Sequence, residues 1–177
     1  DIIKTEAIDL NHQGQGVCKI DGFTLFVDSL LPGEVASVEI TKLQKNFGYG
    51  RVKELLKTSK DRILSECPSF GSCGGCQLQH LHYDAELRFK VKMVEETIKR
   101  LGHLDLKVDE IIGMNKPYYY RNKVQIPFRK QDQKIVTGFF MKNSHQIVPL
   151  QECLIQPIYA TKIAKWLRDF SEKYHLT

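Results

Sequence analysis

The chain has no long apolar run and few of the residues that build secreted scaffolds. Its 177 residues include one Trp, three Met and only five Cys, and no stretch is apolar for the length of a bilayer-spanning helix. The sequence starts at Asp1 without a basic and then apolar leader. A secreted disulfide scaffold would be smaller and cysteine-dense throughout. We therefore expect a cytoplasmic protein that does not bind membranes.

The composition that is present suits a folded protein. Hydrophobic residues make up 42% of the sequence, which is enough for a core, and this length holds one ordinary domain or two small ones. The 26 Lys and Arg exceed the 21 Asp and Glu, giving a formal charge of +5. This mild excess favours a polyanionic partner without establishing one.

Residues 1–58 carry the pattern of several short strands. Apolar and polar residues alternate along 34–41, as on a strand with one buried face. Further apolar runs at 24–27 and 49–55 are separated by Gly, Pro and Asn, which place a turn about every ten residues. We predict a five-stranded β-barrel of the OB type.

A polar segment, 57–62, reads as a linker to a second domain, 59–177. Pro and Gly then prevent regular structure in a loop over 66–80. Apolar residues at steps of three and four predict a helix over 84–102, with Asp84 as its N-cap.

The rest of the second domain mixes strands with one more helix. Alternation predicts strands at 123–129, 135–141 and 146–148. A last helix begins near Ile158. The predicted fold class is α+β, a barrel followed by an antiparallel sheet with helices.

Four cysteines form the strongest chemical signal. Five residues separate Cys67 from Cys73, two separate Cys73 from Cys76, and Cys153 lies far along the chain. Two thiolates with two residues between them can hold one metal ion or cluster. A third cysteine nearby and a fourth at a distance are typical of iron–sulfur sites, so the spacing favours a cluster.

Two other arrangements of these thiols stay open on the spacing. His80 or His82 could complete a zinc site with three cysteines, and the thiols could also be unligated. Cys18 stands apart in a barrel strand, where a free cysteine is most often a small buried hydrophobic residue.

Basic and aromatic residues occur together at two places. Single-stranded RNA needs aromatic rings for base stacking and Lys or Arg for phosphates. In the barrel the candidates are Lys45, Phe47, Tyr49 and Arg51, with Lys42 nearby. In the second domain they are Arg121, Lys123, Arg129 and Lys130. Rings that cap the barrel core and an ordinary charged solvent face explain the same patterns.

Longer motifs span the chain. They are CPSFGSCGGCQLQHLHY at 67–83, YRNK at 120–123, GFF at 138–140 with SHQIV at 144–148, and Cys153 in the place of a fourth ligand. Near the start are GQGV at 14–17 and LPGE at 31–34. The later motifs resemble the cluster loop and second domain of bacterial RNA uracil-5-methyltransferases. Residues 1–60 resemble their TRAM domain, an RNA-binding barrel.

The resemblance implies a four-iron, four-sulfur (4Fe-4S) cluster on Cys67, Cys73, Cys76 and Cys153. It also adds Arg121, Asn122 and His145, which occupy family motifs, to the candidate RNA contacts. The implied reaction is S-adenosylmethionine-dependent (SAM-dependent) methylation of uridine C5 after a catalytic cysteine has added to C6. Ribosomal RNA, 23S, is the implied substrate and tRNA the second choice, with the enzyme a monomer.

The catalytic domain of that family has no counterpart in the sequence. A SAM-binding domain needs on the order of 150 residues, and a single helix is expected after Cys153. We therefore expect a front portion of the enzyme, without catalytic or SAM-binding residues and inactive by itself. The apolar stripe of the helix over 84–102 is expected to pack on the catalytic domain.

Two rival functions stay open. Radical methylthiotransferases also join a TRAM barrel to a cluster, but their cysteines follow a CxxxCxxC pattern and their barrel comes last. The other rival is a stand-alone RNA-binding module with a structural zinc site.

Overall fold

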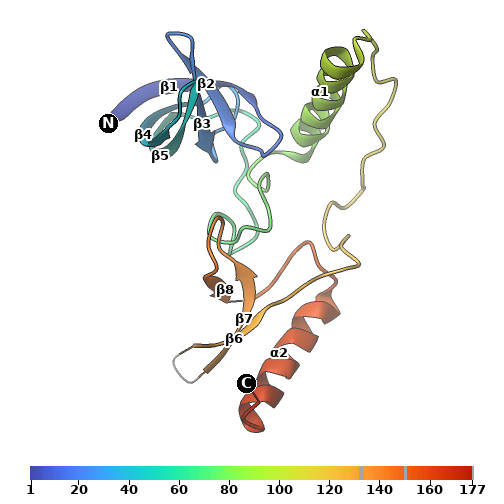
Figure 1. Cartoon of the computed structure of the whole chain (residues 1–177). Coiled ribbons are helices and arrows are strands. Elements are labelled where there is room, and N and C mark those ends of the chain that lie inside the picture. The colour runs from blue at the N-terminus through green and yellow to red at the C-terminus, as the bar shows by residue number, and fades with distance from the viewer. Residues whose placement is uncertain (132–133, 150, 177) are drawn as a thin grey trace. The chain divides into compact units, whose positions relative to one another are not determined.

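The computed structural model describes residues 1–131, 134–149 and 151–176 (Figure 1). The chain forms two compact units, each built from two stretches of sequence. The barrel unit comprises 1–64 and 77–113, and the cysteine unit comprises 65–76 and 114–177. These units differ from the predicted division into residues 1–58 and 59–177. That division into functional domains stays a prediction.

The barrel unit begins with the five strands that the sequence predicts. They are β1 (Ile2–Leu10), β2 (Gly16–Ile20), β3 (Phe23–Asp28), β4 (Val35–Leu43) and β5 (Phe47–Lys57). Their order is β1-β2-β3-β5-β4, and antiparallel pairing of β1 with β4 closes the barrel. The structure confirms the α+β class and the five-stranded barrel.

Alternation along the strands fills the barrel interior. Ala36 and Val38 of β4 are fully buried, as predicted, and pack with Leu25 and Val27 of β3. On β5 the inward positions are Gly48 and Gly50. A Cβ at Gly50 would lie 2.4 Å from Cγ1 of Val38, so only glycine fits there. Successive strand residues point to opposite faces, so Phe47 and Tyr49, which alternate with these glycines, face outward.

A buried ion pair anchors the segment that was expected to be a linker. The Glu34 side chain is fully buried and accepts hydrogen bonds from the backbone N–H of Leu31 and Ser59, at 2.8 and 3.1 Å. Nη2 of Arg62 donates to Glu34 at 2.7 Å and to the Ser29 carbonyl at 2.7 Å. The linker prediction for 57–62 was therefore wrong, because these contacts tie the segment to the barrel.

Helix α1 (Tyr83–Gly102) belongs to the barrel unit. Its N-cap is His82, whose Nδ1 accepts a hydrogen bond from the Asp84 N–H at 3.3 Å. Asp84 itself lies in the first turn, where the positive end of the helix dipole stabilises a carboxylate. The prediction of Asp84 as the cap was wrong by two residues.

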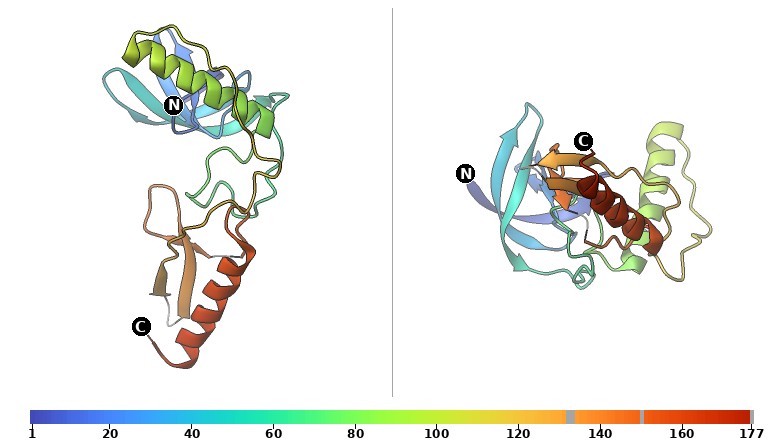
Figure 2. Two further views of the ribbon diagram at one scale, coloured as in Figure 1. Left: turned by 90° about the vertical axis from the view of Figure 1, so that its right-hand side faces the viewer. Right: turned by 90° about the horizontal axis from the view of Figure 1, so that it is seen from below.

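One side of α1 packs on the barrel. Ala85 and Phe89 join a buried cluster that also contains Leu10, Leu31 and Leu81. Residues 103–113 then return alongside the helix, where the Val108 N–H donates to Glu95 at 3.0 Å. Figure 2 shows this segment running beside α1. Packing of the helix stripe on a catalytic domain stays a prediction.

The cysteine unit contains a small sheet and one helix. Its elements are β6 (Phe128–Gln131), β7 (Lys134–Phe140), β8 (Ile147–Pro149) and α2 (Ile158–Lys173). The sheet is antiparallel in the order β6-β7-β8, and α2 lies against β7. These elements confirm the strands predicted at 135–141 and 146–148 and the helix start at Ile158. No helix in the described residues has the length and apolarity to cross a bilayer.

The strand predicted at 123–129 is present only from Phe128 onward. Upstream of it, the N–H groups of Tyr119 and Arg121 donate to the carbonyls of Leu154 and Ile155, at 2.7 and 2.9 Å. Pro127 has no N–H to add to a strand ladder. The alternation is present in the sequence, but the backbone just before it bonds to the loop at 154–155 and the regular strand begins only at Phe128.

Candidate functional site

The cysteine loop is held against the sheet of its own unit. The Cys73 N–H donates to the Ser69 carbonyl at 2.8 Å, which tightens the loop into a turn. The Gly74 N–H donates to the Phe140 carbonyl at 2.9 Å. A Cβ at Gly74 would lie 3.1 Å from that carbonyl oxygen, so the glycine permits this close approach. The loop therefore has a fixed position at the end of β7.

The structure brings at least three of the four predicted thiols into one electrostatic environment. Burial raises the pKa of the Cys73 thiol, and the charges of Cys153 and Cys67 raise it further. The N–H of Gly75, 3.3 Å from Cys73 Sγ, and the Arg121 guanidinium act in the opposite direction. All four cysteines of the site lie in this unit and are half-buried, and none forms a disulfide.

The assignment of a cluster to these four cysteines stays a prediction. In the described part of the chain, no three His, Cys, Asp or Glu side chains are grouped so that they could hold a metal ion. Sulfurs that share one zinc lie roughly 4 Å apart, since each Zn–S bond is about 2.3 Å. In a four-iron cluster each thiolate binds a different iron, so the thiols stand farther apart.

The two candidate histidines of a zinc site lie in the barrel unit instead. His80 is buried, and burial followed by the charge of Arg62 lowers its pKa to about 4. His82 caps α1 through its Nδ1. Neither residue belongs to the unit that carries the four cysteines.

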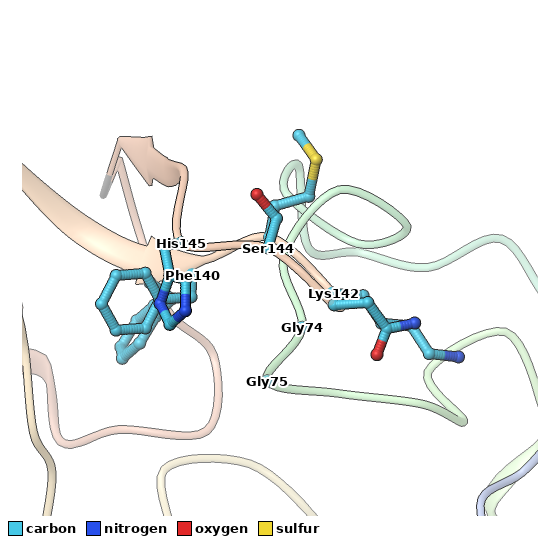
Figure 3. Close-up of a pocket in the computed structure, with 9 residues that line it drawn as sticks. Gly74, Gly75, Phe140, Lys142, Ser144 and His145 are labelled. Atoms are coloured by element: carbon cyan, nitrogen blue, oxygen red, sulfur yellow. The ribbon is translucent and has the colours of Figure 1, made fainter.

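A pocket of about 600 Å³ opens beside the cysteine loop (Figure 3). Gly74 and Gly75 form one wall, and the turn from Phe139 to His145 forms the other. The rings of Phe140 and His145 meet edge to face with centroids 5.9 Å apart. Arg129 donates from Nη1 to the His145 carbonyl at 3.1 Å. With Lys142 also in its lining, the pocket combines aromatic rings with a cation, which suits a nucleotide.

The predicted barrel contacts Phe47 and Tyr49 belong to a cluster of three rings on the outer face. Phe26 of β3 lies 5.7 Å from Phe47 and 6.0 Å from Tyr49, measured between ring centroids. Phe47 and Tyr49 are 5.6 Å apart. Local sequence did not single out Phe26, because only the parallel pairing of β3 with β5 places it opposite Tyr49. We call Phe26, Phe47 and Tyr49 the aromatic triad.

The other predicted RNA contacts are all exposed. Lys45 lies in the β4–β5 turn, and Arg51 of β5 forms an ion pair with Glu39 at 2.6 Å. Arg121, Asn122 and Lys123 lie in the extended segment before β6. The predicted contacts therefore gather in two places, one in each unit. Phe140 and Lys142 line the pocket in the cysteine unit and were not predicted as RNA contacts, although both lie within five residues before the predicted His145 in the sequence.

Comparison with known proteins finds two kinds of likeness. Residues 6–53 match the TRAM domain. The chain is 39% identical over 174 residues to an uncharacterized RNA methyltransferase of Halalkalibacterium halodurans, covering 98% of the chain and 38% of the relative. It is 43% identical over 166 residues to one of Listeria monocytogenes, covering 94% and 37%. The chain thus spans a little over a third of the length of these curated relatives.

A solved structure shares the fold. It is a tRNA (uracil-54, C5)-methyltransferase of Pyrococcus abyssi in complex with S-adenosyl-L-homocysteine, with a TM-score of 0.64 and 22% identity. The match covers 97% of this chain and 37% of the other. At this identity the likeness shows the fold alone.

Proposed function

We propose that the chain is the RNA-binding, cluster-carrying portion of a SAM-dependent RNA methyltransferase that forms 5-methyluridine. The similarity to RNA methyltransferases over nearly the whole chain carries this proposal. The matched TRAM domain makes RNA the partner, and the shared fold of a uracil-C5 methyltransferase supports the uridine base as the target.

Cys67, Cys73, Cys76 and Cys153 would hold a 4Fe-4S cluster in this proposal. Such a cluster would supply a rigid cross-link between the loop and the segment around Cys153. Arg121 lies close enough to lower the pKa of the Cys73 thiol, so its positive charge also favours a bound anionic centre. The chain's part is then to position the pocket lined by Phe140, Lys142 and His145 for RNA.

The exposed aromatic face of α2 suits an interface with a further part of a larger protein. Trp166, Phe170 and Tyr174 stack along the helix, with centroids 5.3 and 4.5 Å apart in order. Trp166 is 61% and Tyr174 is 53% exposed. A row of exposed rings of this size usually marks an interface. Because the curated relatives are more than twice as long, we propose that a further domain of the parent protein covers this face.

Ribosomal RNA is the proposed substrate, specifically a uridine of 23S rRNA. The choice rests on the combination of a TRAM barrel with a three-cysteine loop and a distant fourth cysteine, which resembles the ribosomal RNA enzymes. The tRNA substrate in the name of the structural neighbour belongs to that protein, which is only 22% identical.

Deletion of the gene in its source organism is expected to remove a C5 methyl group from a 23S uridine. Mass mapping of ribosomal RNA and tRNA from the deletion and parent strains measures this loss. Restoring the gene should restore the methyl group. A loss confined to tRNA would contradict the ribosomal substrate, and unchanged 5-methyluridine in both RNAs would contradict the proposed function.

A further inference from the structure

A cleft of about 590 Å³ lies within the barrel unit, between α1 and the loop that joins β1 to β2. This volume is in the range of roughly 300–1,000 Å³ that small-molecule sites occupy. Phe26, Phe89 and Met93 give the cleft apolar and aromatic surface. His12, Lys99 and Arg100 add polar and cationic groups.

Phe26 connects this cleft to the aromatic triad. It lines the cleft and also contacts the rings of Phe47 and Tyr49. One surface therefore runs from β5 across β3 to α1, with rings at successive positions. A single strand of RNA that stacks on the triad is directed by this surface toward the helix.

The cationic side chains that line the cleft from α1 differ in whether a carboxylate pairs with them. Lys92 is neutralised, because it pairs with Asp9 at 2.7 Å and approaches Glu96 at 3.7 Å. Both of these carboxylates also line the cleft. Arg100, about two turns beyond Lys92 on the helix, forms no ion pair with any residue in 1–131, 134–149 or 151–176. The unopposed positive charge thus lies at the last turn of α1.

Aromatic rings and a guanidinium in one cleft supply the chemistry that RNA binding requires. The base gains from contact with a ring, and the phosphate gains from a charge-assisted hydrogen bond. Lys92 balances one of the two carboxylates of Asp9 and Glu96, so these three side chains together carry one net negative charge, which the charge of Arg100 offsets.

We propose that this cleft binds single-stranded RNA, adjacent to the nucleotides that stack on the aromatic triad. The base contacts Phe26 and Phe89, and Arg100, about three helical turns beyond Phe89, contacts the phosphate of a nucleotide further along the strand. This inference rests on the proposed RNA-binding function and extends it to α1, which lies outside the matched TRAM residues 6–53.

The test measures binding of fluorescein-labelled oligouridylate of about ten nucleotides, within the roughly 4–16 that one OB fold covers. Arg100→Gln is expected to weaken binding about fivefold and to lower the slope of log affinity against log salt by about 0.7, the value for one phosphate contact. Phe26→Leu, which keeps an apolar side chain, should weaken binding by about fivefold or more because stacking is lost.

Lys90→Gln is the matched control, since Lys90 is an exposed cation of the same helix that does not line the cleft. It should change affinity less than about twofold. Oligouridylate containing 4-thiouridine should in addition cross-link to residues 89–100, as mass spectrometry of the digest would show. Thermal melting of each variant confirms that it is folded.

The possible outcomes distinguish a failure of the proposed cleft from a failure of the proposed RNA-binding function. No binding of RNA by the wild-type chain would overturn both. The cleft would be overturned if Arg100→Gln and Lys90→Gln bound RNA with equal affinity and α1 gave no cross-link. If Tyr49→Leu still bound RNA more weakly than wild type in that case, the RNA-binding function would stand. Cross-linking of α1 with loss of affinity in Arg100→Gln supports the cleft.

Discussion

Replacement of Cys153 by Ser is expected to remove most of the iron from the chain. Cys153 is the proposed ligand from far along the sequence, and its charge acts on Cys73. A cluster with three thiolates loses one iron readily and its sulfide is then exposed to solvent. Anaerobic purification followed by iron and acid-labile sulfide analysis would show both falling to a minor fraction of the wild-type values. The visible absorbance of the cluster should fall with them.

Cys18→Ala is the matched control for this loss. Cys18 is fully buried in the barrel core, where burial raises the pKa of its thiol and so keeps it protonated. This substitution removes a cysteine from the other unit and should leave the iron content unchanged. Equal iron in Cys153→Ser and wild type would contradict the assignment of Cys153 as a ligand.

Replacement of Arg62 by Met is expected to destabilise the barrel unit by about 3–5 kcal/mol, because it leaves the buried Glu34 charge without its partner. Glu34 is fully buried and receives two hydrogen bonds from the guanidinium. The free energy of unfolding, from urea titration followed by circular dichroism, measures the effect. Arg88→Met breaks an exposed ion pair with Asp61 and should cost less than about 1 kcal/mol.

The pH dependence of stability gives a second readout at the same pair. Burial by itself raises the pKa of Glu34, but hydrogen bonds from Arg62, Leu31 and Ser59 and the charge of Arg62 outweigh it, so the pKa lies below the ordinary 4.5. A depressed carboxyl pKa stabilises the fold above the unfolded-state pKa, and this contribution is lost as the pH falls through the folded value. Arg62→Met should lose less stability on acidification than wild type. An equal or larger acid loss in the variant would contradict this role for the pair.

The strands of the barrel could be predicted because their signal is local. Alternation along β4 put Ala36 and Val38 inside, and turn residues marked the ends of the strands. The same kind of pattern failed before Phe128, where the backbone of Tyr119 and Arg121 bonds to the loop at 154–155. Alternation reports which face is buried, but not which segment accepts the hydrogen bonds.

The grouping of the chain into compact units depends on contacts between distant residues. Leu81 and Ala85 pack with Leu10 and Leu31, and this cluster places α1 in the barrel unit. No local pattern contains that information, so a cut after the last barrel strand was the natural expectation. Phe26 was missed for the same reason, since its place in the triad comes from the pairing of β3 with β5.

The cysteine site shows what spacing can and cannot predict. The interval between Cys73 and Cys76 indicated a site because two thiolates on one tight turn can bind together. Cys153 has no local partner in the sequence, so spacing could include it only as a distant fourth thiol, and the motif resemblance implied its place as the fourth ligand. The structure then places Cys153 and Cys67 within electrostatic reach of Cys73.

Metal analysis of the anaerobically purified wild-type chain tests the account most directly. Four thiols around one inorganic centre should yield close to four iron and four sulfide per chain with little zinc. One zinc per chain without iron or sulfide would contradict the cluster, and with it the proposed link between the cysteine loop, the segment around Cys153 and the RNA-binding pocket beside them.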